Sequence, residues 1–260
     1  MSLLALAAAF GALFGSFANV VISRGPRAWG FVAAEGRPVG LAFPPSRCEA
    51  CQHRLGPAEL IPVVSYLVLK GRCKRCGAAI GLRHLAVEVT GALLAVVALA
   101  LLGVTAEAAA AFACLLTLLI LAVIDLETGY LPDALTLPLL GGGLVHAGLL
   151  PDRSLSMSLA GALIGGGSFL LLRFLYQRLR GREGLGGGDV KLLAAGGAWC
   201  GPIALPAIIL IASVSALLVA FAKAAAKRTN IAGSDELRFG PYLALGIAAG
   251  FLFVAPGYPG

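Results

Sequence analysis

The chain has 260 residues, of which 59% are hydrophobic and 13% are charged, and its mean hydropathy is +0.92. This composition excludes a water-soluble globular domain and indicates an all-α protein that crosses a membrane several times. The formal net charge of +7 follows from the Lys and Arg content of the loops, so it does not indicate nucleic-acid binding.

Glycine is abundant, with 35 residues. Small residues let membrane helices approach closely, and a four-residue spacing places two of them on one helix face. Pairs with this spacing are Gly11/Gly15, Gly161/Gly165 and Gly246/Gly250. The alternative for each pair is glycine enrichment without a specific helix contact.

The first element is an uncharged apolar run over residues 2–22. A secretory signal carries positive charge before its apolar core, whereas Arg24 and Arg27 come after this one. The pattern predicts that residues 1–22 hold an uncleaved first membrane helix, with its N-terminus outside and its C-terminal end in the cytoplasm.

Residues 23–83 form a polar insert that holds ten of the twenty Lys and Arg. It contains two C-x-x-C turns separated by twenty-one residues, and their cysteines are Cys48, Cys51, Cys73 and Cys76. Two such turns can supply four thiolates to one tetrahedral ion, so the spacing predicts a structural Zn²⁺ site. Two disulfides are the alternative, which a reducing cytoplasm disfavours.

Residues 84–260 are expected to form a core of seven membrane helices. The clear spans are residues 85–104, 106–124, 131–150, 154–176 and 239–254. Residues 190–222 are interrupted by Cys200-Gly201-Pro202, so they can form one broken span, a re-entrant segment with a span, or two spans. Two spans give eight in total and place nineteen of the twenty basic residues on one side, leaving only Arg153 opposite. The basic side of a membrane protein is cytoplasmic, so we predict about eight spans.

The predicted topology places two aspartates at the ends of membrane spans. Asp125 ends one span, and Asp189 begins another after the glycines Gly186, Gly187 and Gly188. Both fall at the cytoplasmic face at similar depth, where carboxylates near lipid mark functional sites. Two close carboxylates do not both ionise cheaply, so one can deprotonate a water while the other protonates a peptide carbonyl. The glycines leave room for a substrate backbone.

Each acid also has a simpler explanation. Aspartate is favoured at helix starts, which fits Asp189 and Asp133. Asp125 lies at a helix C-terminus, where the helix dipole disfavours negative charge, so a cap does not explain it. By spacing alone, the other acids that can replace one of the pair are Glu127, Asp133 and Glu183.

Two further charged residues lie near the expected membrane boundary. Glu88 is about one turn inside a span, where it can face a cavity or pair with a base. Lys191 can neutralise a carboxylate, or its side chain can extend toward the interface.

Several stretches together resemble a known family, the type IV prepilin peptidases, also called prepilin leader peptidase/N-methyltransferases. In chain order these are Gly15–Ile22, the two cysteine turns, Ile61–Tyr66, Asp125, Leu131–Asp133, Gly186–Leu193 and Phe239–Leu243. Their order and spacing make the resemblance specific. The chain departs from the family pattern at Gly187, where an aromatic residue is expected, at Val190, where Phe is expected, and over Gly25–Gly40.

The resemblance implies that Asp125 and Asp189 are the catalytic pair of a GxGD-type membrane aspartic protease. Asp133 is then a motif residue without a required chemical role. Gly186, Gly187, Gly188, Lys191, Asp133 and Glu88 are candidates for substrate binding or site support. The substrates are prepilins or type II secretion pseudopilins of the bacterial inner membrane, cut on the cytoplasmic side, with the pilus or secretion machinery an indirect partner.

The resemblance also implies N-methylation of the new N-terminus with S-adenosylmethionine. The candidate cofactor-binding residues are Gly15, Ser16, Phe17, Asn19 and Arg24. Close helix packing beside the zinc module is the alternative role for this stretch.

Two other functions are alternatives to the peptidase. A proton-coupled transporter would use the aspartates as a relay, but it requires carboxylates near the bilayer midplane. A non-catalytic assembly factor that docks partners through its zinc module would tolerate Asp125→Asn, whereas the protease would not.

Overall fold

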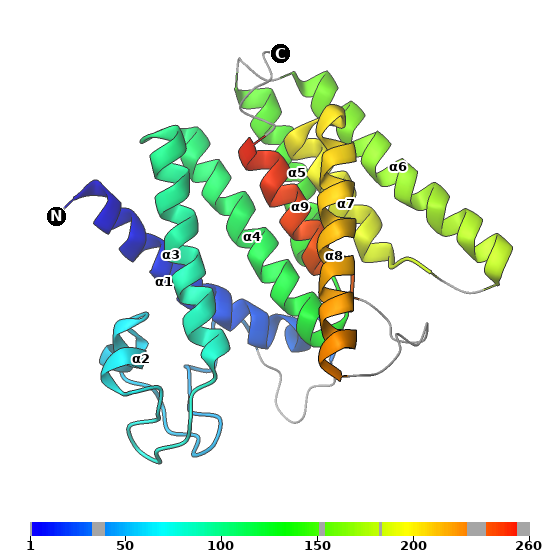
Figure 1. Cartoon of the computed structure of the whole chain (residues 1–260). Coiled ribbons are helices and arrows are strands. Elements are labelled where there is room, and N and C mark those ends of the chain that lie inside the picture. The colour runs from blue at the N-terminus through cyan, green and yellow to red at the C-terminus, as the bar shows by residue number, and fades with distance from the viewer. Residues whose placement is uncertain (1, 33–39, 151–153, 182–183, 228–237, 254–260) are drawn as a thin grey trace. The chain divides into compact units, whose positions relative to one another are not determined.

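The computed structural model describes residues 2–32, 40–150, 154–181, 184–227 and 238–253 (Figure 1). Within these residues the regular structure is helical, apart from two isolated β-bridges that join Arg47 to Arg54 and Arg72 to Ala79. The predicted all-α fold is therefore confirmed. Arg153 and Glu183, which entered the sequence predictions, lie outside the described residues.

The long helices correspond closely to the predicted apolar segments. In chain order the helices are α1 (Leu3–Ala28), α2 (Val64–Val68), α3 (Leu82–Leu102), α4 (Ala106–Thr128), α5 (Asp133–Leu149), α6 (Leu155–Arg180), α7 (Gly187–Cys200), α8 (Leu205–Lys227) and α9 (Gly240–Phe253). Two 3₁₀ turns, Pro57–Leu60 and Pro202–Ala204, precede α2 and α8.

The region of uncertain topology folds as two helices. α7 ends at Cys200, and Gly201 has φ +76°, a left-handed value that glycine adopts without a Cβ penalty. Among the described residues, the helices long and apolar enough to cross a membrane are α1, α3, α4, α6 and α8 with its preceding turn. α5, α7 and α9 have 17, 14 and 14 residues. The protein is thus a helical membrane protein in which α5 and α7 are shorter than a typical span of about 20 residues, while α9 extends to the last described residue.

The chain forms two compact units, residues 1–120 and 121–260. In the first unit α1 packs along α3. A Cβ on Gly15 would lie 2.8 Å from Glu88 Cα, and one on Gly91 would lie 3.1 Å from Gly15 Cα. The backbones of α1 and α3 therefore touch, which confirms the Gly11/Gly15 prediction.

The second unit is built around α7, which contacts α5, α6, α8 and α9. Eight of its fourteen residues are buried. Gly197 of α7 meets Gly161 of α6 so closely that neither position has room for a Cβ. On the α5 side, Trp199 Nε1 donates a hydrogen bond of 2.8 Å to the Leu139 carbonyl. Gly197 and Gly161 thus bring α6 and α7 into backbone contact, and the Trp199 side chain links α7 to α5.

This packing predicts the effect of a side chain at the α6–α7 contact. Gly161→Val forces α6 away from the Gly197 backbone, and overpacking of this kind costs about 1–3 kcal/mol or more. We expect a lower Tm in detergent, measured by a thermal aggregation or fluorescence scan. Gly167→Val on the same helix is the control, because a Cβ at Gly167 meets nothing within 4 Å. Equal Tm losses in both variants would contradict the backbone contact.

Candidate functional site

Asp125 lies in the last turn of α4, and its side chain is buried. The helix ends just beyond it: Gly129 has φ +74°, and its N–H donates to the Asp125 carbonyl at 2.9 Å. The carboxylate oxygen Oδ2 has no hydrogen-bond partner among the described residues. A Cβ on Gly240, the first residue of α9, would lie 2.6 Å from that oxygen. The backbone of α9 therefore begins directly against the Asp125 carboxylate, at a point where a Cβ would displace that side chain.

Asp189 lies in the first turn of α7 and is also buried. Its carboxylate accepts a hydrogen bond from the backbone N–H of Gly186, the N-cap residue. This is the contact that an N3 acid makes in a capping box, and it places negative charge at the favourable end of the helix dipole. Asp189 is therefore at N3 and not at the N-cap position that its simpler explanation assigned, which is occupied by Gly186.

Leu131 connects the surroundings of the two acids. A Cβ on Gly188 would lie 2.7 Å from Leu131 Cβ, and one on Gly240 would lie 3.2 Å from Leu131 Cδ1. This leucine thus packs between the starts of α7 and α9. The charge of Asp125 acts on Asp189 through a Coulombic interaction, so the carboxylates lie within electrostatic range of each other. Among the described residues, Asp125 and Asp189 are the two buried acids.

Arg238 is a neighbour of Asp125 that the sequence reasoning counted only as a loop charge. Its guanidinium donates to the Leu126 carbonyl at the end of α4, and its charge acts on Asp125. A cation at a helix C-terminus satisfies an unpaired carbonyl and opposes the negative end of the dipole. Arg238 therefore offsets the unfavourable position of Asp125. The available sequence signal was its place directly before the Phe239-Gly240-Pro241 stretch.

Asp133 and Lys191 form an ion pair instead of joining the buried acids. Lys191 Nζ lies 2.6 Å and 2.7 Å from the two Asp133 carboxylate oxygens, and both side chains are about half exposed. The pair links the start of α5 to the first turns of α7, two residues beyond Asp189. Glu127, which also fitted the spacing, is exposed.

Glu88 makes its contact within the first unit. Its Oε2 accepts a hydrogen bond of 2.7 Å from the backbone N–H of Val63 in the polar insert. The predicted pairing with a basic group is replaced by this backbone contact, which joins the insert to α3.

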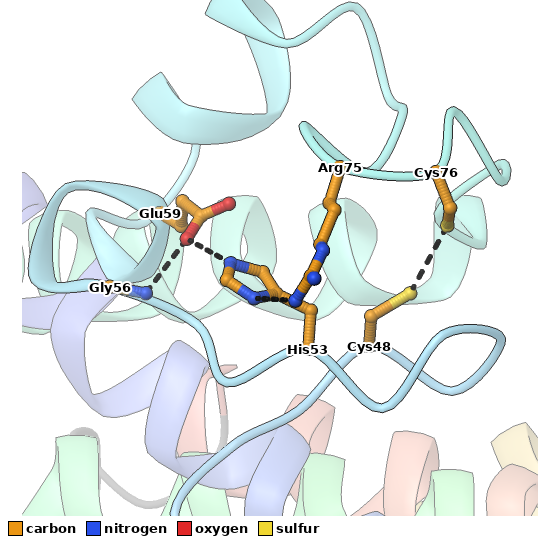
Figure 2. A network of polar contacts seen from close by, with 6 residues as sticks. All are labelled: Cys48, His53, Gly56, Glu59, Arg75 and Cys76. Atoms are coloured by element: carbon orange, nitrogen blue, oxygen red, sulfur yellow. Dashed lines mark hydrogen bonds and ion pairs between the residues drawn. The ribbon is translucent and has the colours of Figure 1, made fainter.

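The four cysteines of the insert lie together, as the sequence predicted. Their sulfur atoms are all within 4.8 Å of one another. In each C-x-x-C turn, the backbone N–H of the residue after the second cysteine donates a hydrogen bond to the carbonyl of the first cysteine. Figure 2 shows Cys48 and Cys76, from different turns, with their sulfurs 3.8 Å apart. All four are free thiols, so the disulfide alternative does not describe this structure. The cluster has the donor set and spacing to bind a metal ion such as zinc.

The surroundings of the second cysteine turn favour the charged form of Cys73 over that of Cys76. The backbone N–H groups of Cys76 and Arg75 lower the pKa of Cys73 to about 7. The backbone N–H of Ala78 lowers the pKa of Cys76, but the neighbouring sulfurs and burial raise it overall to about 11. Four thiolates this close repel one another, and a bound cation removes that repulsion.

His53 supports the cluster from beside it. Its Nε2 lies 3.8 Å from Glu59 Oε2, and its Nδ1 lies 3.4 Å from Arg75 of the second cysteine turn. Glu59 also accepts the Gly56 N–H at 2.8 Å (Figure 2). These contacts hold the two turns together across twenty-two residues of sequence.

The N-terminal stretch proposed for cofactor binding has mainly structural contacts in this structure. Gly15 packs on the Glu88 backbone, and Asn19 Nδ2 donates to the His84 carbonyl at 2.9 Å. Arg24 donates to the Pro44 carbonyl at 2.6 Å. Phe17 is exposed, and Ser16 is half-buried. Asn19 Oδ1 is buried without a hydrogen-bond partner among the described residues.

Comparisons with known proteins cover nearly the whole chain. Residues 9–102 match the family model described as Bacterial Peptidase A24 N-terminal domain, and residues 112–221 match the type IV leader peptidase family. A prepilin leader peptidase/N-methyltransferase of Burkholderia pseudomallei (strain 1026b) is 42% identical over 98% of this chain and 87% of its own length. Proteins of the same name from Pseudomonas putida and Neisseria gonorrhoeae are 38% and 37% identical, over 92% and 96% of this chain and 87% and 90% of their own lengths. No solved structure matches.

Proposed function

Because the chain belongs to the type IV leader peptidase family, we propose that it is a membrane aspartic endopeptidase that cleaves prepilin leaders and N-methylates the new N-terminus. Its substrates are type IV prepilins or type II secretion pseudopilins, whose short basic leaders are cut on the cytoplasmic side. The observation that carries the peptidase is the pair of buried carboxylates, Asp125 and Asp189, at the ends of α4 and α7 in one unit. The transporter alternative has no support among the relatives.

The proposed chemistry uses the two aspartates as one unit. One carboxylate takes a proton from a water molecule as the oxygen attacks the scissile carbonyl, and the partner protonates the carbonyl oxygen. The tetrahedral intermediate then collapses as the leaving nitrogen takes up a proton. Asp189 is held by the Gly186 N–H, and Arg238 acts on Asp125, so both acids have a fixed supporting group.

The neighbouring residues support this site in different ways. At Gly187 and Gly188 the missing Cβ lets Arg173 and Leu131 approach the start of α7 closely, so these neighbours occupy the space that the sequence interpretation assigned to a substrate backbone. Lys191 and Asp133 form a half-exposed ion pair between α7 and the start of α5. Glu88 supports the first unit by its contact with Val63.

The proposed topology has about eight membrane helices in the bacterial inner membrane. Its parts are the first helix (1–22), the polar insert (23–83) and a peptidase core (84–260). In this topology α5 and α7 cross as short helices, which a bilayer accommodates by local thinning. The positive-inside distribution places the aspartates and the insert on the cytoplasmic side.

Zinc is the metal that we propose for the cluster, bound by Cys48, Cys51, Cys73 and Cys76. Four protein ligands leave no open position, so the ion would stabilise the insert without taking part in catalysis.

S-adenosylmethionine would supply the methyl group for the new N-terminal amine. Gly15, Ser16, Phe17, Asn19 and Arg24 are the proposed cofactor-binding residues, supported by their place in the stretch shared with the family and by the buried Asn19 Oδ1.

Substitution of either aspartate tests the peptidase. We expect Asp125→Asn and Asp189→Asn each to lower the rate of cleavage of a model prepilin by roughly 1,000-fold or more. The reason is that an Asn amide can neither take the proton from the attacking water nor protonate the scissile carbonyl. Product N-termini are read by mass spectrometry with and without S-adenosylmethionine, where a methyl mass shift reports the second activity. Asp133→Asn is the control and keeps cleavage within about tenfold, since its exposed ion pair contributes little. Full cleavage by either buried-site variant would exclude the aspartic mechanism.

Metal analysis tests the cysteine cluster. The purified chain is expected to carry about one zinc per molecule, and Cys73→Ser to lose most of it, because a tetrahedral site requires all four donors. Retention of zinc should fall as the pH drops, since thiolates bind the ion and thiols do not. Cys114→Ala is the matched control, because this buried cysteine lies outside the cluster. Equal zinc content in Cys73→Ser and Cys114→Ala would contradict the assignment.

A further inference from the structure

The polar insert carries an exposed apolar face that its own fold does not cover. The face consists of five large side chains, each between 44% and 74% exposed, which are Leu60, Ile61, Val64, Leu67 and Val68. Val64, Leu67 and Val68 belong to α2 and have the three- and four-residue spacing that places side chains on one side of a helix. On the other side, Tyr66 packs on Gly71 and donates to the Ile80 carbonyl. The apolar face therefore points away from the insert.

The position of α2 in the first unit indicates what covers this face. Val63, directly before α2, donates its N–H to Glu88 of α3, a helix that is long and apolar enough to cross a membrane. Glu88 is six residues inside α3, which corresponds to about 9 Å along the helix axis at about 1.5 Å per residue. The start of α2 is thereby held beside the second turn of a membrane helix, as Figure 1 shows.

The backbone at this junction is strained in a way that fixes its geometry. Val63 is a β-branched residue with φ +62°, a conformation that such residues rarely adopt. A strained backbone persists only where its surroundings over-determine it. Here the Glu88 carboxylate accepts the Val63 N–H at 2.7 Å, which holds α2 in one orientation on α3.

The residues that follow the apolar face in the sequence carry charge of one sign. Residues 60–80 contain four basic residues, Lys70, Arg72, Lys74 and Arg75, and no acidic residue. Of the neighbouring acids, Glu59 is turned inward to His53 and Gly56, and Glu88 accepts the Val63 N–H. An apolar face bordered by basic side chains is the pattern of a segment that lies in the interface of an anionic membrane.

We propose that α2 is an interfacial membrane anchor: its apolar face inserts among lipid acyl chains beside α3, and the basic residues that follow contact anionic headgroups. The anchor holds the cysteine module at the membrane surface, so that the module does not move freely on its connections. This inference rests on the membrane location of the chain and is independent of the proposed peptidase activity.

Fluorescence quenching by brominated lipids tests the anchor. The full zinc-loaded chain carrying Val68→Trp is placed in vesicles with about 30% phosphatidylglycerol, a typical anionic fraction for surface binding, and the parent spectrum is subtracted. Ala50→Trp, in the exposed turn between Cys48 and Cys51, is the matched control. We expect blue-shifted emission and at least about twofold quenching for Trp at 68 but not at 50, since only the apolar face reaches the acyl region.

The charge contribution is tested in the same system. Lys70→Gln with Arg72→Gln should weaken quenching of the Trp at 68, as should replacement of phosphatidylglycerol by phosphatidylcholine. Zinc content of every variant confirms that the insert is folded. Solvent-like emission at both Trp positions in anionic vesicles would overturn the anchor. Protection of the Trp at 68 only after a prepilin peptide is added would overturn it in favour of a protein-binding surface.

Discussion

The close packing of α7 against its neighbours is the constraint on which the second unit depends. Gly197 meets Gly161 of α6 backbone to backbone, and a Cβ on Gly196 would lie 2.6 Å from Ile247 of α9. Without a hydrophobic driving force between helices in lipid, such small-residue contacts supply the packing energy. These contacts also determine where the N-terminus of α7 lies, because a short helix that packs closely against several neighbours cannot slide or rotate. The placement of Asp189 is therefore a consequence of glycines located far along the same helix.

The second constraint is the free-energy cost of burying two acidic side chains at helix ends. Asp125 is buried at the unfavourable end of the α4 dipole, and its Oδ2 has no hydrogen-bond partner among the described residues. Arg238 offsets part of that cost, while Asp189 is compensated by the Gly186 N–H. Asp125 lies at the helix end where the dipole disfavours negative charge, whereas Asp189 lies at the end where the dipole favours it. The unfavourable placement of Asp125 inside an otherwise well-packed unit is typical of a functional position.

Some of these features follow from sequence and others do not. Helical segments, the cysteine cluster and the position of both aspartates at helix ends are local properties, and spacing is enough to predict them. The contact of Arg238 with Leu126 joins residues 112 positions apart, and the Asp133–Lys191 pair joins residues 58 apart. Tertiary packing alone brings such residues together. The left-handed Val63 was also unpredictable, because its Glu88 partner comes from another element.

The most direct test of the account is whether Asp125 and Asp189 act as one catalytic unit. Single-turnover cleavage of a model prepilin is measured by mass spectrometry, with enzyme in excess, for both single Asn variants and for the double variant Asp125→Asn/Asp189→Asn. Residues that act as a unit show strongly non-additive losses. The account predicts that the double variant retains the same residual rate as either single variant. Losses that multiply in the double variant would show that the two aspartates act independently and would contradict a shared site.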